Sequence, residues 1–525
     1  MLAVYSGVKK SLVLERLGMG QVVGCGQSVP DLTAEDIEQS ARIVAQMGPE
    51  PFVQAMTAHP DFNVIIGGRA YDPSLYVAYC AYNALDRQDQ TFSDLGKLQL
   101  GTFTHMGKVL ECGGLCSTPK TIGAYATVFK DDSFTITPLD PSARCIPLSV
   151  AAHTLYEKTR PDILHGPGGY LNLNTATYTA QADGRTVLVR GSTFHSSPSE
   201  NLPYTVKLEG ARTVGVRTLM MGSFHDPILI PQIDDFLVKA KCYVAKQHTH
   251  ITTPWDFDFH VYGRHPNSME IFVVGEAIAT TQEISNSLAS TARIACSHGS
   301  YPGQKATSGT FAMGIGGKFE LETDLCAEFC IYHLMSLVEG EEGAANDDET
   351  GIRRTGLFRF KSIFIGNGDG QSTDDTGQIC IPIIPVAKHA TPSSTSTRIP
   401  DPIDPNPRTL IDVAKVIRSK NAGPYELTMD VVFDSPTVYN MVKESALLTP
   451  SVIASLYSIS ESEVIYCDFF DAALAFKATI PRKRNGRDVA SGGYMENDVH
   501  GSQQYVRLMH VPLSDGLITK FAEAM

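Results

Sequence analysis

The segment FNVIIGGRAYDP, residues 62–73, indicates the class of fold. Its unbroken apolar run, Val64–Ile66, is typical of a strand that is buried on both faces of a parallel sheet. Two glycines then turn the chain and are followed by Arg69 and Asp72. In open α/β sheets, ligands bind beside the polar residues that follow the C-terminal ends of strands. Position as well as residue type therefore makes Arg69 and Asp72 candidate substrate-binding residues.

The patterns on either side of this segment mix helices with strands. Residues 32–48 predict a helix that Thr33 caps and Gly48 ends. From about residue 122 onward, alternating apolar and polar residues predict antiparallel strands, and residues 226–247 return to a helical pattern. We therefore expect an α/β fold with α+β elements, in which a parallel-sheet N-terminal region precedes a mixed α+β middle and a small α+β C-terminal domain.

One segment divides the chain by its composition. Residues 386–408 are rich in Pro, Ser and Thr, which is typical of an interdomain linker. This predicts a large domain over residues 1–385 and a small domain over residues 409–525.

Charge and composition narrow the class of partner. The chain has 43 basic and 57 acidic residues, so it has no overall attraction for nucleic acid or for anionic membranes. Its N-terminus lacks a signal-peptide pattern, and no apolar run is long enough to span a bilayer. The 11 scattered cysteines suit reduced thiols. We expect a cytoplasmic protein that binds a small molecule and neither nucleic acid nor a membrane, with a homo-oligomer left open.

The segment HMGKVLECGGLC, residues 105–116, carries the groups needed for proton transfer. Lys108 and Glu111 are one helical turn apart, although the alternation in KVLEC also suits a strand. A carboxylate beside a lysine, with His105 nearby, can remove a proton from carbon next to a carbonyl group. The competing interpretation is the end of a strand with exposed charges.

Two further segments supply candidate binding groups. In YTVKLEG, Lys207 and Glu209 would point to the same side of a strand. HGPGGYLNL, with His165, Gly168 and Gly169, is glycine-rich enough for an anion-binding loop but lacks the Lys-Ser/Thr end of a nucleotide P-loop.

The C-terminal domain offers polar residues next to turns and alternating strands. We expect these side chains to line the same cleft from the second domain. They are Arg418, Lys420, Asn421, Lys477, His500 and Gln504.

A metal site has weaker support. Cys326, Cys330 and His333 would align on one face of a predicted helix, as zinc ligands can. That face is also the apolar side of the segment, and buried cysteine is common in protein cores. We assign no metal and no other cofactor.

Longer segments of the chain resemble a known family. The N-terminal ones are ARIVAQMGPEPFVQAM, IIGGRAYDPSL, THMGKVLECGGL, SVAAHTLYEK and YTVKLEGARTVGVRT, and the C-terminal ones are RSKNAGPYELTMDVVFDS and VHGSQQY. The first set resembles the acyclic terpene utilisation family (its A-type protein), and the second resembles a small domain of unknown function that is usually encoded beside it. The resemblance implies a fusion of the two. It also implies that the first part of the family domain is missing, so that the parallel sheet is incomplete.

The resemblance and the residues together give a functional hypothesis. The family sits among genes for degrading branched acids and acyl-CoA thioesters. We expect a lyase, hydratase or isomerase that acts on a carboxylic acid or acyl-CoA thioester in branched-acid or terpenoid-type catabolism. Glu111 would act as base, Lys108 or Lys207 would stabilise the oxyanion, and Arg69 would hold a carboxylate. The alternatives are a non-catalytic accessory subunit of an acyl-CoA-processing complex and a metal-dependent hydrolase.

Overall fold

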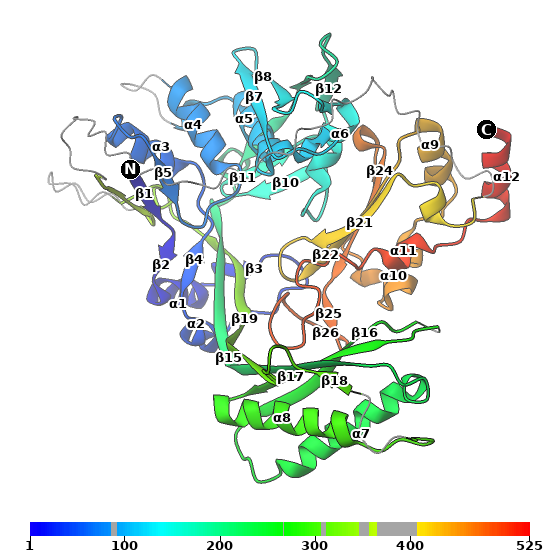
Figure 1. The fold of residues 1–525 in the computed structure, drawn as a ribbon. Helices are drawn as coiled ribbons and strands as arrows, with labels where there is room; N and C mark the ends of the chain where they lie inside the picture. Colours follow the sequence, from blue (N-terminus) through cyan, green and yellow to red (C-terminus); the bar gives the residue numbers. More distant parts are fainter. Residues whose placement is uncertain (86–91, 266, 306–310, 346–355, 365–406, 525) are drawn as a thin grey trace, which may run out of the picture.

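The computed structural model describes residues 1–85, 92–265, 267–305, 311–345, 356–364 and 407–524. The predicted linker, residues 386–408, lies almost wholly outside the described residues. Helices and strands alternate through the described chain in several sheets (Figure 1), which confirms the mixed fold class. Within the described residues, no helix combines the length and the apolarity that a membrane crossing requires.

The N-terminal region contains a small sheet with one parallel pair. Strand β1 (Leu2–Tyr5) pairs in parallel with β5 (Ile65–Gly67) and antiparallel with β20 (Arg359–Ser362). The predicted parallel strand is therefore present. Its expected burial on both faces is wrong, because β5 lies at the edge of the sheet and Val64 and Ile66 are 50% and 53% exposed.

The helix predicted over residues 32–48 is much shorter in the structure. Helix α2 spans Ala34–Gln39, and Thr33 caps it as expected by accepting a hydrogen bond from the Asp36 amide. The chain then forms strand β4 (Ile43–Ala45), which pairs with β2 (Gly7–Val8) and β15 (Thr205–Phe224). The available partner strands explain why this segment leaves the helix despite its helical spacing.

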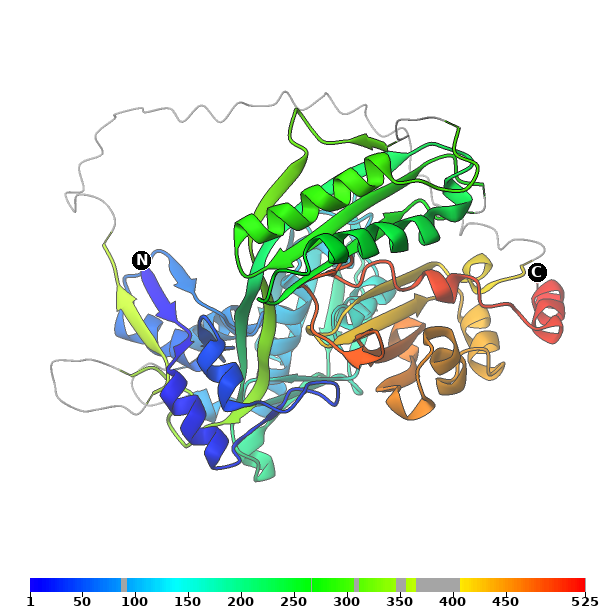
Figure 2. The same ribbon diagram turned by 90° about the horizontal axis from the view of Figure 1, so that it is seen from below.

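Two long strands connect the N-terminal region to a lobe that lies at the bottom of Figure 1 and at the top of Figure 2. They are β15 and β19 (Glu320–Ser336), which pair antiparallel at the centre of an eight-stranded sheet. Helices α7 (Ile233–Gln247) and α8 (Gln282–His298) pack on the lobe's sheet through an apolar core. The other strands of this sheet are β2, β3 (Val22–Gly24), β4, β16 (Trp255–Tyr262), β17 (Ile271–Ala279) and β18 (Phe311–Met313).

The antiparallel strands expected after residue 122 form two sheets beside helix α5 (Lys97–Leu110). Their strands are β7 (Ala124–Phe129), β8 (Ser133–Pro138), β12 (Thr177–Ala180) and β13 (Val187–Arg190) in one sheet, and β10 (Ile163–Gly166), β11 (Gly169–Asn172) and β14 (Thr193–Ser196) in the other. The remaining N-terminal helices are α1 (Lys10–Gly18), α3 (Glu50–Ala58), α4 (Ser74–Ala84) and α6 (Pro147–Ala151).

The C-terminal region is built on a four-stranded antiparallel sheet in the order β21, β22, β24, β23. Its elements are β21 (Val416–Asn421), β22 (Glu426–Val432), α9 (Pro436–Glu444), α10 (Pro450–Tyr457), β23 (Tyr466–Phe470), β24 (Ala475–Pro481), α11 (Val506–Met509) and α12 (Asp515–Ala524). Along β24, Phe476 and Ala478 enter the apolar core of this region. Lys477 and Thr479 alternate with them and therefore face the rest of the chain.

Candidate active site

An arginine–glutamate pair joins β5 to β15. Arg69 donates from Nε to Glu209 Oε2 at 2.7 Å and from Nη2 to Glu209 Oε1 at 2.9 Å. Lys207 Nζ lies 3.5 Å from Glu209 Oε1 and donates to the Tyr332 hydroxyl at 3.1 Å. Burial would raise the pKa of Glu209, but the hydrogen bond from Arg69 and the charges of Lys207 and Arg69 leave that pKa below its ordinary value. Arg69, which the sequence predicts to hold a ligand carboxylate, thus makes two parallel hydrogen bonds to the carboxylate of Glu209.

A second ion pair lies at the C-terminal end of α5. Lys108 Nζ donates to Glu111 Oε1, and the two side chains are only 1% and 9% exposed. Lys108 lies in α5 and Glu111 is its C-cap residue, so this segment ends a helix and does not form the strand that its alternation also allowed. Burial raises the pKa of Glu111, although Lys108 and Lys158 oppose that shift. Among the described residues, Glu111 Oε2 is buried and has no hydrogen-bond partner.

Tyr71 connects the two ion pairs. Its side chain is buried, and its hydroxyl group has no hydrogen-bond partner within the described part of the chain. Burial raises the pKa of Tyr71 above its ordinary range, and the charges of Lys108, Glu111, Asp72 and Lys207 all act on it. Charges from both ion pairs therefore influence the pKa of the Tyr71 hydroxyl group. The structure brings six of the candidate residues into one group, which we call the charged cluster: Arg69, Asp72, Lys108, Glu111, Lys207 and Glu209.

Sequence reasoning missed Lys158, which also belongs to the charged cluster. Its Nζ atom lies 5.0 Å from the centroid of the Tyr71 ring, within cation–π range. Burial lowers the pKa of Lys158 against the opposing charge of Glu111, and Lys207 lowers it further. Lys158 lies in the short polar segment EKTRPD, residues 157–162, which has no periodicity, so no local pattern identifies it.

The segment that carries Lys158 is held by the C-terminal region. Lys477 Nζ donates to the Leu155 carbonyl at 2.9 Å, and Thr479 Oγ1 donates to the Thr159 carbonyl at 2.7 Å. Thr159 Oγ1 in turn donates to Glu426 Oε2 at 2.7 Å. The position of Lys158 therefore depends on contacts with residues more than 260 positions away in sequence.

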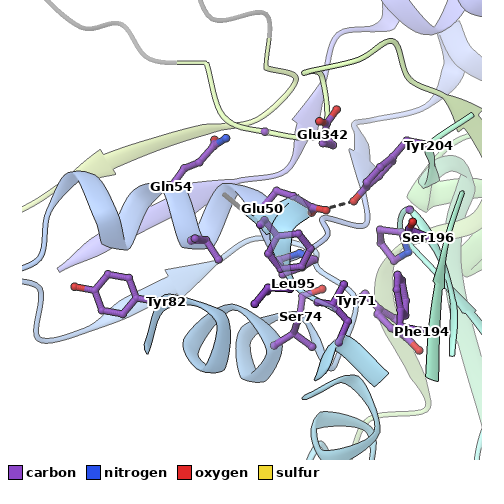
Figure 3. A pocket seen from close by; sticks show the side chains of 18 of the residues that line it. Glu50, Gln54, Tyr71, Ser74, Tyr82, Leu95, Phe194, Ser196, Tyr204 and Glu342 are labelled. Carbon is purple, nitrogen blue, oxygen red and sulfur yellow. Dashed lines mark hydrogen bonds between the residues drawn. The ribbon is translucent and has the colours of Figure 1, made fainter. Parts of the chain in front are cut away.

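A cavity of about 660 Å³ is lined in part by Tyr71 (Figure 3), whose ring also contacts Lys158 of the charged cluster. Tyr204 donates a hydrogen bond from its hydroxyl to Glu50 Oε2 at 2.9 Å. Burial raises the pKa of Glu50 to about 7, and the nearby charge of Glu342 adds to this shift. Sequence reasoning also missed Glu50, which stands at the start of helix α3 and looks like an ordinary first-turn carboxylate.

The glycines of HGPGG allow tyrosine rings to approach the β10–β11 hairpin. A Cβ atom on Gly166 would lie 2.7 Å from the Tyr71 ring, and one on Gly168 would overlap the Tyr204 ring. Gly168 also needs its left-handed φ of 67°. The close approach of the tyrosine rings explains why glycines stand here, so the predicted anion-binding role is not needed to explain them. Gly168 lines the cavity, while Gly169 packs against the His195 carbonyl and His165 lies against Tyr170.

Two family models match separate parts of the chain. Residues 25–227 match the model of the acyclic terpene utilisation family protein AtuA, and residues 410–512 match a domain of unknown function, DUF4387. The chain joins an AtuA-like region to a C-terminal DUF4387 domain. Neither a curated protein nor a solved structure matches the chain. The family description associates the AtuA-like region with the utilisation of acyclic terpenes.

His105 of the AtuA-like region lies three residues before Lys108 on α5, but it packs among uncharged side chains. It is fully buried, its Nδ1 atom is 2.6 Å from Ser192 Oγ, and its ring packs edge-on against Phe134 and Tyr178. Burial lowers the pKa of His105 to about 3. It is therefore a neutral packing residue near neutral pH.

Three of the candidates in the DUF4387 domain contact the AtuA-like region. Arg418 and Lys477 both pair with the buried carboxylate of Asp430, and Arg418 also donates to the Ala152 carbonyl at 3.3 Å. Lys420 Nζ lies 5.5 Å from the centroid of the Tyr156 ring. These cations hold the segment that precedes Lys158.

The other three candidates lie in a separate network of the DUF4387 domain. Asn421 donates to the Val499 carbonyl at 2.6 Å and accepts a hydrogen bond from Arg482. Gln504 donates to Asp498 at 2.8 Å, and the side chain of His500 is exposed. Their hydrogen bonds organise the C-terminal loop of this domain, away from the charged cluster.

The helix expected to align Cys326, Cys330 and His333 is wrong, because all three lie on strand β19. His333 Nε2 lies 3.0 Å from the Pro30 carbonyl, and its Nδ1 accepts from the Tyr332 amide. Among the described residues, no group of three or more His, Cys, Asp or Glu side chains could hold a metal ion. The metal-dependent hydrolase hypothesis thus loses its geometric basis.

Proposed function

We propose that the protein is an acid–base enzyme of the lyase, hydratase or isomerase type that acts on a carboxylic acid or an acyl-CoA thioester. The description of the AtuA family supports a role in acyclic terpene utilisation, and we place the reaction in the degradation of branched or terpenoid-type acids. One observation carries the chemical proposal. Glu111 Oε2 and the Tyr71 hydroxyl are buried without hydrogen-bond partners among the described residues, in a cluster that also contains lysines. Buried polar groups are normally paired, so a ligand is the natural partner for both.

Glu111 is the proposed general base. Efficient proton abstraction near neutral pH favours a carboxylate whose pKa is raised, and burial raises that of Glu111. Lys108 keeps this carboxylate paired on one oxygen and leaves Oε2 for the substrate. A neighbouring cation or hydroxyl donor can then stabilise the enolate oxygen, a role that suits Lys207, Lys158 or Tyr71.

Arg69 is proposed to bind a ligand carboxylate with the part of its guanidinium group that Glu209 leaves available. Within the described residues, its Nη1 atom makes long contacts, 3.5 Å to the Ala70 carbonyl and 3.7 Å to Asp72 Oδ1. The bidentate pair with Glu209 fixes the plane of the guanidinium group, so Nη1 has a defined direction.

The test is substitution of the proposed base. Glu111→Gln keeps the shape of the side chain but removes its basicity, so we expect turnover to fall at least a hundredfold, a typical contribution of acid–base catalysis, while substrate still binds. The exposed Glu461→Gln is the matched control and should behave as wild type. Unchanged turnover in Glu111→Gln would remove it from the mechanism. If the wild-type protein turns over no acid or thioester and co-purifies with an acyl-CoA carboxylase or transferase, the protein is an accessory subunit instead.

A further inference from the structure

We propose that the cavity beside Tyr71 binds an uncharged aliphatic chain, and that this chain is the apolar part of the substrate. The assignment of the chain to the substrate rests on the proposed function, whereas binding of the chain itself does not. Tyr71 lines the cavity (Figure 3), whereas none of the seven residues of the charged cluster does.

The size and lining of the cavity favour an apolar ligand. Its volume of about 660 Å³ lies within the range of small-molecule sites. Most of the wall is aliphatic or aromatic. The apolar side chains in it include Val53, Val77, Leu85, Leu95, Leu100 and Phe194. Moving an aliphatic chain from water to such a wall is favourable in proportion to the apolar area that it buries.

The charges of the cavity argue against an anionic group within it. The described residues that line it include no Lys, Arg or His, but they include two carboxylates, Glu50 and Glu342. A ligand carboxylate placed here would be desolvated beside groups of its own charge, without a cation among the described lining residues to pair with. A ligand carboxylate or thioester belongs instead beside the lysines near Tyr71, which are Lys108, Lys158 and Lys207 and which do not line the cavity.

Several polar groups interrupt the apolar wall of the cavity, and such groups can orient a mostly apolar ligand. Glu50 and Tyr204 bond to each other, which occupies the Tyr204 hydroxyl hydrogen and one oxygen of Glu50. Ser74 and Thr104 also line the wall, and Thr104 stands one helical turn before Lys108 on α5. An aliphatic chain in the cavity therefore lies next to the elements that carry the proposed chemistry.

Three eight-carbon probes test the proposal: n-octanol, octanoate and suberate, which carries a carboxylate at each end. Binding is measured by thermal shift and by calorimetric titration. We expect octanol and octanoate to bind, and suberate to bind at least tenfold more weakly than octanoate, because one of its carboxylates must enter the acidic cavity. Suberate affinity equal to that of octanoate, or no binding of octanol, would overturn the proposal.

Cavity-filling variants locate the bound probe. Val77→Phe on α4 fills the cavity, and Leu75→Phe places the same ring on the exposed side of the same helix. Ser196→Phe fills the cavity from β14 and supplies the result if Val77→Phe does not fold. We expect at least a tenfold loss of octanol affinity in either folded filling variant and none in Leu75→Phe. Wild-type affinity in a folded filling variant contradicts the assignment.

The two proposals can fail separately. Glu111→Gln should bind octanol as the wild-type protein does, since Glu111 is not part of the cavity wall. If Glu111→Gln loses turnover but the wild-type protein does not bind octanol, the proposed chemistry is supported and the proposed ligand of the cavity is refuted. If the wild-type protein binds octanol and Glu111→Gln keeps full turnover, the ligand of the cavity is supported and the role of Glu111 is refuted.

Discussion

Replacing Lys477 with Met should release the segment that positions Lys158. Lys477 and its partner Asp430 are 0% and 5% exposed, and Lys477 also donates to the Leu155 carbonyl. Removing one partner of a buried ion pair costs roughly 3–5 kcal/mol. Asp430 keeps its hydrogen bond from Arg418, so we expect a value near the lower end, about 3 kcal/mol. At about 1.4 kcal/mol per factor of ten, this corresponds to roughly a hundredfold change in the opening equilibrium.

Hydrogen exchange measured by mass spectrometry reports this change directly. Amides in peptides that cover residues 152–160 should exchange about a hundredfold faster in Lys477→Met, because exchange follows the local opening equilibrium. Lys443→Met makes the same substitution in the exposed ion pair with Asp471, which contributes about 0–1 kcal/mol. If exchange in residues 152–160 is no faster in Lys477→Met than in Lys443→Met, the segment is not held by the C-terminal domain, and the argument for Lys158 fails.

Two further substitutions probe the buried groups around Tyr71. The hydroxyl of Tyr71 has no hydrogen-bond partner among the described residues. Tyr71→Phe should therefore leave the free energy of unfolding unchanged or raise it by up to about 1 kcal/mol, while turnover falls. A large loss of stability in urea unfolding would show that the hydroxyl has a structural partner. Burial raises the pKa of Glu50 from 4.5 to about 7, so the folded state holds more protons than the unfolded state in that window and loses stability as pH rises through it. Thermal unfolding of Glu50→Gln should lack this loss, at most about 1.4 kcal/mol per pH unit, and identical pH profiles for variant and wild type would refute the shifted pKa.

Local sequence patterns predicted the parts of the fold that depend on periodicity. The alternation of Lys207 and Glu209 with buried Val206 and Leu208 identified one side of β15 before its partners were known. The antiparallel strands after residue 122 follow the same rule. Helix α2 ended early because β4 found partner strands in β2 and β15, and no local pattern contains that information.

The candidate site depended even more on distant contacts. Arg69 and Glu209 meet across 140 positions, and position after a strand was enough to select the first of them. Lys158 and Glu50 have no local signature, because their importance comes from burial beside Tyr71 and Tyr204. Arg418 and Lys477 were chosen as charged residues, but the structure pairs both with Asp430.

The position of a bound ligand tests the central claim most directly. Once a screen of carboxylic acids and acyl-CoA thioesters identifies a ligand, a crystal structure of Glu111→Gln in complex with it should place its carbonyl or carboxylate oxygen within hydrogen-bond distance of the Tyr71 hydroxyl. A ligand bound instead in the loop network around His500 and Gln504, with Tyr71 still unpartnered, would contradict the account.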